Sequence, residues 1–227
     1  MSGDWLPLQD HYERRLREAG ATPQGVDWPD GPGLEARFAT QLRVLDAVPA
    51  GGEAPLLLDV GCGPGLLLDY LAETGRLSQV RYRGVDISPA MVAAARARWP
   101  EQAFEVRDIV AEPLEPESVD AAIMNGVLTE RQGIPRERMV ALAEGIVAAA
   151  FRAARYGVAF NAMSKHVDWE RDDLFHWGFD EVAAFLKRDV TRHMAFRADY
   201  GLYEFTAFAW REPQRPAPLA PEDWWTR

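Results

Sequence analysis

Short apolar runs alternate along the middle of the chain with longer segments whose apolar residues recur every three to four positions. The short runs are typical of buried strands and the longer segments of amphipathic helices. The predicted strands are residues 56–58, 80–86, 104–108, 118–124 and 156–160, and the predicted helices between them are 66–71, 88–99 and 135–155. Strands and helices that alternate in this way predict a parallel sheet with right-handed crossovers and helices on both of its faces.

The pattern changes in the last third of the chain. Residues 163–178 are polar and aromatic without a clear period, and a helix is predicted over 179–187. Residues 190–197 and 203–210 then alternate as strands do. Because a short link joins these two strands, we expect them to pair antiparallel. The fold class is therefore α/β, with a mostly parallel sheet and an antiparallel strand at its C-terminal end.

Both ends of the chain differ from this core. A short charged helix is predicted over 10–19, a turn-rich stretch follows, and a second amphipathic pattern runs from 34 to 45. We divide the chain into an N-terminal helical part (1–52), the main domain (53–211) and a proline-rich tail (212–227) that we expect to be disordered. Two interpretations of the first part remain open, a helical decoration packed on the sheet or a lid over a ligand pocket.

Candidate chemistry gathers where the predicted strands end. A turn rich in glycine, residues 59–65 (DVGCGPG), connects the first strand to its helix, and glycines let a backbone take positive φ and approach a ligand closely. Asp86 and Asp108 end the next two strands, and Asn125 and Asn161 follow the fourth and fifth. Ligands of open α/β sheets bind outside the carboxyl ends of the strands, where the strand order reverses. These positions therefore predict one site, although dinucleotide-binding folds share such a turn.

The details of the turn narrow the choice. Asp59 closes the strand, the glycines follow a Gly-x-Gly-x-Gly spacing, and Pro64 falls near the helix start. This resembles motif I of the class I methyltransferases that depend on S-adenosyl-L-methionine (SAM), a Rossmann-like family. From about Tyr12 to Trp210 the chain is similar to a group of bacterial small-molecule methyltransferases; the segments that carry this likeness are GVDW (25–28), the Arg37-Phe38 pair, NGVL (125–128), FNAMSKHVD (160–168) and DYGLYEFT (199–206). The resemblance implies SAM as the cofactor and a small molecule as the methyl acceptor.

Roles for single residues follow from this resemblance. Asp86 suits the two ribose hydroxyls, Asp108 the exocyclic amine of the adenine, and Ile87 the adenine ring, whereas Arg37 could pair with the carboxylate of the cofactor. Cys62 has no evident base beside it and is not expected to be a nucleophile. The expected cofactor-binding residues are Trp28, Arg37, Asp59, Gly61, Cys62, Gly63, Gly65, Asp86, Ile87, Asp108, Ile109, Asn125 and Gly126.

Methyl transfer needs a base only when the nucleophile must lose a proton. The candidates for that role are His166, Asp168 and His176, in a segment that could roof the acceptor. Phe175-His176 stands where relatives often carry paired tyrosines, so a contact through an aromatic hydroxyl is in doubt. Two other functions stay open, an intramolecular cyclisation of SAM and a SAM-binding accessory protein without catalysis.

Composition limits the partners and the compartment. The formal net charge of -10 repels phosphate backbones, so we expect no nucleic-acid substrate. One cysteine allows no internal disulfide and fits a reducing cytoplasm. No stretch has the length of a membrane span or the pattern of a signal peptide, and no histidine pair has the spacing of metal ligands. We therefore expect neither a membrane partner nor a metal, and the sequence leaves the oligomeric state open.

Overall fold

The computed structural model describes residues 5–214 and contains one central sheet. Most of the predicted proline-rich tail, from residue 215 onward, lies outside the described residues. The strands are β1 (Leu56–Val60), β2 (Arg81–Asp86), β3 (Ala103–Val106), β4 (Val119–Met124), β5 (Ala154–Ser164), β6 (His176–Trp177), β7 (Met194–Arg197) and β8 (Glu204–Trp210).

The strand order confirms the predicted fold class. The order is β3-β2-β1-β4-β5-β8-β7, with the short β6 paired to β5 beyond this path. β1 to β6 pair in parallel, whereas β8 is antiparallel to both β5 and β7. After β3 the chain crosses to the other side of β1, so the order reverses between β1 and β4. A ligand site is expected at that point, beyond the carboxyl ends of the strands.

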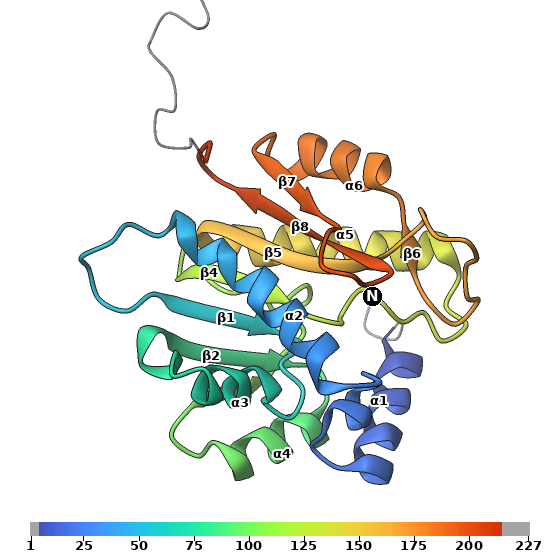
Figure 1. Cartoon of the computed structure of the whole chain (residues 1–227), viewed down its shortest axis with the longest axis horizontal. Coiled ribbons are helices and arrows are strands. Elements are labelled where there is room, and N and C mark those ends of the chain that lie inside the picture. Colours follow the sequence, from blue (N-terminus) through green and yellow to red (C-terminus); the bar gives the residue numbers. More distant parts are fainter. Residues whose placement is uncertain (1–4, 215–227) are drawn as a thin grey trace, which may run out of the picture.

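Helices cover both faces of the sheet. In Figure 1, α2 (Gly31–Gln41) and α3 (Leu66–Glu73) lie in front of the strands and α5 (Arg136–Ala153) lies behind them. α4 (Pro89–Arg98) follows β2, and α6 (Phe179–Phe185) packs near β7. Shorter helical segments are the 3₁₀ helices η1 (Pro23–Val26), η2 (Leu42–Ala47) and η3 (Leu77–Gln79) and the π-helical turn η4 (Leu186–Val190).

The central strands read as continuous apolar runs because both of their faces are buried. Successive side chains of a strand point to opposite faces. Leu57 and Ile123 accordingly join the core that includes residues of α2 and α3, whereas Leu58 and Ala122 join the core that includes residues of α5. All four are fully buried. The sheet is thereby fixed between two apolar layers, which gives the strand ends a rigid frame.

Three details differ from the predictions. Asn161 lies inside β5, which continues to Ser164, rather than after the strand. The strand predicted from 190 begins only at Met194, because residues 186–190 continue α6 as η4. The aperiodic segment 163–178 contains β6, whose two residues are both buried. A strand this short has no period to read, so the sequence could not reveal it.

α1 (Leu6–Ala19) stands apart from these layers, next to the edge where β1 and β2 end (Figure 1). It begins four residues earlier than the predicted helix, and Pro7 in its first turn suits a helix start. Only Leu8 of this helix is buried. Among residues 5–214, no helix combines the length and the apolar character of a membrane span.

Candidate active site

The glycine turn after β1 depends on backbone conformations that side chains rarely adopt. Gly61, Gly63 and Gly65 have φ values of 69°, 52° and 83°. A Cβ on Gly61 would lie 2.4 Å from the side chain of Val127, whereas a Cβ on Gly63 would lie 3.7 Å from Val26. Gly61 therefore lets the β4–α5 loop approach, and Gly63 leaves open the space between the turn and the N-terminal segment.

Asp86 at the end of β2 braces this turn. One carboxylate oxygen accepts a hydrogen bond from the Gly63 N–H at 2.9 Å, and the other accepts from the Ser88 N–H at 2.8 Å. Burial raises the pKa of Asp86, and these backbone hydrogen bonds oppose that shift. Each oxygen keeps a second lone pair, so the carboxylate can still accept hydrogen bonds from a ligand.

A buried triad lies under the turn. Asp59 accepts a hydrogen bond from the Tyr82 hydroxyl at 2.8 Å, and burial raises the pKa of Asp59 to about 7. Burial, with the nearby charges of Asp86 and Asp59, also raises the pKa of the Cys62 thiol. A thiol that resists deprotonation is a poor nucleophile, which agrees with the structural role expected for Cys62.

Asp108 lies two residues beyond the end of β3. Its Oδ1 accepts hydrogen bonds from the Val110 N–H at 2.9 Å and the Ala111 N–H at 3.1 Å. Its Oδ2 accepts from Nε1 of Trp5 at 3.1 Å, a contact that brings α1 to the end of β3. Asp108 thus links the third strand end to the N-terminal segment.

These strand ends surround a cavity of about 1080 Å³, counted to its open mouth. Of the expected cofactor-binding residues, the cavity wall contains Trp28, Asp59, Gly61, Cys62, Gly63, Asp86, Ile87, Asp108, Ile109, Asn125 and Gly126. Gly65 is not in the wall, because it starts α3 and faces Trp99.

Arg37 is also absent from the cavity wall. Its Nε lies 2.8 Å from Oε1 of Glu204 on β8, and its guanidinium lies 3.8 Å from the centre of the Trp28 ring. In the structure a buried acid, Glu204, engages the guanidinium, and the expected pairing of Arg37 with a ligand carboxylate stays a prediction.

The N-terminal segment forms the roof of the cavity. The cavity wall contains Trp5, which directly precedes α1, together with Leu8, Gln9 and Tyr12 of α1 and Val26 of η1. Trp5, Leu8 and Gln9 were missed because the predicted helix began at residue 10, whereas Tyr12 lay inside that helix without an expected role. The amphipathic pattern from Leu6 onward, with Pro7 at the helix start, was the signal that could have found them.

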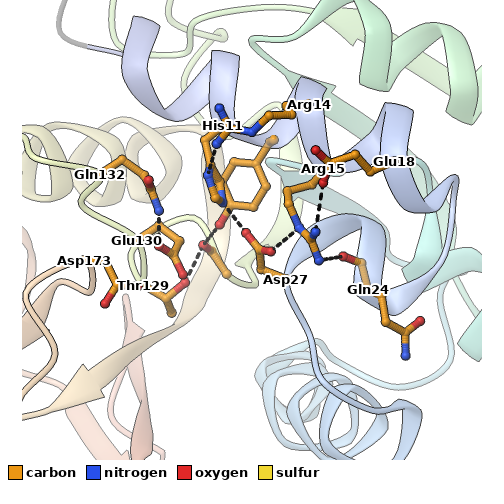
Figure 2. A network of polar contacts seen from close by, with 12 residues as sticks. His11, Arg14, Arg15, Glu18, Gln24, Asp27, Thr129, Glu130, Gln132 and Asp173 are labelled. Carbon is orange, nitrogen blue, oxygen red and sulfur yellow. Dashed lines mark hydrogen bonds and ion pairs between the residues drawn. The ribbon is translucent and has the colours of Figure 1, made fainter.

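Polar contacts hold this roof in place. Figure 2 shows His11 and Arg15 of α1 reaching Asp27, with the Arg15 contact at 2.6 Å. Asp27 has a φ of 62°, a conformation that aspartate tolerates better than most residues. Between these two α1 residues in the sequence, Glu13 accepts a hydrogen bond from the Ser88 hydroxyl at 2.8 Å. Side-chain pairs thus connect α1 to η1 within the roof and connect α1 to the start of α4.

Comparisons with known proteins agree with this geometry. Residues 57–150 match the family model described as a methyltransferase domain. A Mycobacterium tuberculosis protein is 34% identical over 152 residues, which cover 65% of this chain and 88% of that protein. Its name calls it a methyltransferase and gives no substrate. The chain is a class I SAM-dependent methyltransferase. Its cofactor is therefore S-adenosyl-L-methionine.

Two further comparisons place this methyltransferase among known proteins. The trans-aconitate 2-methyltransferase of Variovorax paradoxus is 35% identical over 133 residues, which cover 55% of this chain and about half (49%) of that enzyme. The magnesium protoporphyrin IX methyltransferase of Synechocystis PCC 6803, solved with SAM, has a TM-score of 0.59 at 18% identity and covers 92% of this chain and 97% of that one. At that identity the likeness supports the fold alone.

The cavity of this methyltransferase fits SAM on its own geometry. A side chain on Gly63 would enter the space between the turn and Val26, both of which belong to the wall, so the backbone is left bare where a ligand can approach. Two carboxylates, Asp86 and Asp108, offer acceptors to hydroxyl and amine groups. No cluster of three or more metal-ligating side chains occurs in the described part of the chain.

None of the three expected catalytic residues of the methyltransferase lines this cavity. His166 and Asp168 are exposed, and His166 stacks on Phe179 with ring centres 5.0 Å apart. His176 is buried; its Nδ1 lies 2.7 Å from the Ser164 carbonyl, and its Nε2 accepts from the Arg171 N–H at 3.2 Å. Because both ring nitrogens contact backbone groups, His176 fastens β6 to the loop before it.

Proposed function

We propose that this protein transfers a methyl group from SAM to a small-molecule acceptor that binds in the same cavity, under α1. The observation that carries the proposal is the composition of the cavity wall. Carboxylates and bare backbone line it at the strand ends, and apolar and aromatic side chains line it under the roof. The first part suits the cofactor and the second suits an acceptor with an apolar body.

We assign the cofactor roles by position along the strand ends. The backbone of Gly63 lies against the cofactor, Asp86 accepts hydrogen bonds from the ribose, and Asp108 accepts one from the adenine amine. Ile87 and Ile109 flank the adenine from either strand end. These assignments rest on the shared cavity wall and on the free lone pairs of the two carboxylates.

The charge of the wall favours a neutral or cationic acceptor. Three carboxylates belong to it, from Asp59, Asp86 and Asp108. Arg107 is the one cationic side chain among its described residues, and Nε of Arg107 pairs with Glu105 at 3.1 Å. Trans-aconitate, named for the Variovorax relative, carries three carboxylates, and no free cation among the described wall residues would pair with them. We therefore do not transfer that substrate to this chain.

SAM supplies a methyl group activated by its sulfonium. The protein has to align the acceptor and exclude water, and α1 with η1 would serve as the lid that does so over the domain formed by residues 53–211. The rest of residues 1–52 would be a decoration packed on the sheet, because Leu34 and Phe38 of α2 are buried in the core. Burial and the nearby charges of Glu130 and Asp27 raise the pKa of Tyr12 in the roof, so its hydroxyl stays protonated. Tyr12 would accordingly orient the acceptor rather than remove its proton.

Product analysis tests this proposal. The purified protein is incubated with SAM and a panel of small amines, phenols and heteroaromatic compounds, followed by mass spectrometry. The proposal predicts S-adenosylhomocysteine together with an acceptor 14 mass units heavier, about one CH₂ group. Methylthioadenosine as the main product would show cyclisation, and tight SAM binding without any turnover would favour an accessory role; either result would contradict methyl transfer.

A further inference from the structure

A chain of buried polar side chains runs from β8 to the cavity wall. Glu204 on β8 pairs with Arg37, and its other oxygen accepts a hydrogen bond from Nδ2 of Asn161 at 3.1 Å. Nε2 of Gln41 on α2 donates hydrogen bonds to the side-chain oxygens of Asn161 and Asn125. Glu204, Asn161 and Gln41 are each at most 1% exposed, so water cannot substitute for a missing partner.

The middle of this chain can be oriented in only one way. The backbone N–H of Gly126 points at Asn161 at 2.8 Å, and a backbone N–H can only donate. Asn161 must therefore turn its oxygen toward Gly126 and its N–H₂ group toward Glu204. The carboxylate of Glu204 favours the same orientation, because it accepts hydrogen bonds. Two independent contacts thus fix one amide.

This orientation passes on to the next two amides. The oxygen of Asn161 lies 3.3 Å from Nε2 of Gln41, so Gln41 must present its N–H₂ group there. The same Nε2 lies 3.1 Å from Oδ1 of Asn125. The side-chain oxygen of Asn125 therefore accepts the hydrogen bond from Gln41, and the N–H₂ group of Asn125 points to the opposite side. Since Asn125 belongs to the cavity wall, we place that N–H₂ group on the side of the ligand.

We propose that Arg37, Glu204, Asn161 and Gln41 act as positioning residues that hold Asn125 as a hydrogen-bond donor to the carboxylate of the cofactor. The inference uses the placement of the nucleoside at Asp86 and Asp108 given under the proposed function. With the nucleoside at the ends of β2 and β3, the amino-acid part of SAM extends past the Gly61–Gly63 turn toward β4. Asn125 follows directly after β4.

A hydrogen-bond donor beside β4 would offset the negative charge of the neighbouring wall. The neighbouring wall contains the carboxylates of Asp59 and Asp86 and no cation, because Arg107 lies beyond β3 at the other end of the cavity. A ligand carboxylate would be repelled there unless a donor met it. A neutral amide that is held with its N–H₂ group outward supplies that donor, and hydrogen bonds to charged groups are among the stronger ones.

Calorimetry with two ligands tests the inference on the full-length protein. S-adenosylhomocysteine carries the amino-acid part, and methylthioadenosine lacks it. Asn125→Asp keeps the shape and the oxygen for Gln41 but replaces the donor with a negative oxygen. We expect its affinity for S-adenosylhomocysteine to fall at least about tenfold, while its affinity for methylthioadenosine stays within about twofold. Asn125→Leu, which also lacks the donor, serves if the first variant does not fold.

Gln41→Met tests the positioning chain itself. Methionine fills a similar volume without polar atoms, so Asn125 loses the contact that orients it. We expect the ratio of the two affinities to move about three- to tenfold against S-adenosylhomocysteine. A lower melting temperature with an unchanged ratio would show a merely structural role and overturn the positioning claim.

Asp86→Ala separates failure of the inference from failure of the cofactor placement. It should weaken both ligands together, since both contain the ribose. If it does so while Asn125→Asp binds S-adenosylhomocysteine as the wild type does, only the inference is overturned. If Asn125→Asp weakens both ligands equally, the carboxylate is not the partner of Asn125. If Asp86→Ala changes neither ligand, the nucleoside lies elsewhere and both claims fall.

Discussion

The floor and the roof of the cavity are built on different principles. The floor, the Asp59–Gly65 turn, is fixed by positive φ values and by neighbours such as Val127 that leave no room for side chains. The roof, α1 with η1, buries only Leu8 of its helix and is held by side-chain pairs such as those of Asp27. Backbone geometry thus fixes the part assigned to the cofactor, and exchangeable polar contacts hold the part assigned to the acceptor.

This difference bears on dynamics. Partly exposed ion pairs contribute about 0–1 kcal/mol each, so a segment held mainly by them can open at a small cost. A turn whose conformation is dictated by glycine cannot change without losing the contacts of β1 and β4. We therefore expect the floor to stay formed without ligand and the roof to open for exchange.

Breaking the floor should have the largest effect. In Gly63→Val, the new side chain would need a φ near 52° and would enter the space between the turn and Val26. We expect the affinity for S-adenosylhomocysteine to fall roughly 100-fold or more, equivalent to about 2.7 kcal/mol, in isothermal titration calorimetry.

Gly75→Val is the matched control for this change. Gly75 has a φ of 68°, but the space around its Cβ position is open and it lies outside the cavity wall. Both variants carry a similar backbone strain and should lose a similar amount of melting temperature. Equal affinities in the two variants would mean that Gly63 is not where the cofactor binds.

Breaking the roof should have a smaller effect of a different kind. Asp27→Gly keeps the positive φ without strain and removes the contacts to both His11 and Arg15. We expect proteolysis of α1 to become faster and ligand affinity to fall about two- to tenfold, since closing the roof would cost about 0.5–1.4 kcal/mol more. The melting temperature should change little.

Glu18→Ala is the control for the roof. Glu18 also pairs with Arg15, at 3.1 Å, but its side chain is half-exposed and this ion pair lies within α1. This variant should match the wild type in proteolysis and in affinity. If both variants behave alike, Asp27 does not hold the roof.

The fold and the floor were predictable because their signals are local. Apolar runs and helical periods marked five parallel strands, and glycine spacing marked the turn between β1 and α3. Asp86 and Asp108 could be placed because strand ends of a parallel sheet meet at one edge. In each case the pattern that specifies the feature is a continuous stretch of the sequence.

The roof and the chain of buried polar side chains could not be predicted because their contacts join residues that are distant in sequence. Trp5 meets Asp108 across 103 residues, and Asn161 meets Glu204 across 43. Arg37 was expected at the ligand because nothing in the sequence shows that Glu204 lies 2.8 Å away. His176 was a candidate base, yet its two backbone contacts depend on the pairing of β6 with β5.

The most direct test of this account is a crystal structure of the protein with S-adenosylhomocysteine. We predict that the ligand lies against the backbone of Gly63, with its ribose at Asp86, its adenine at Asp108, and Trp5, Tyr12 and Trp28 above it. A ligand bound outside this cavity, or bound within it while α1 packs elsewhere and leaves the cavity without its roof, would contradict the account.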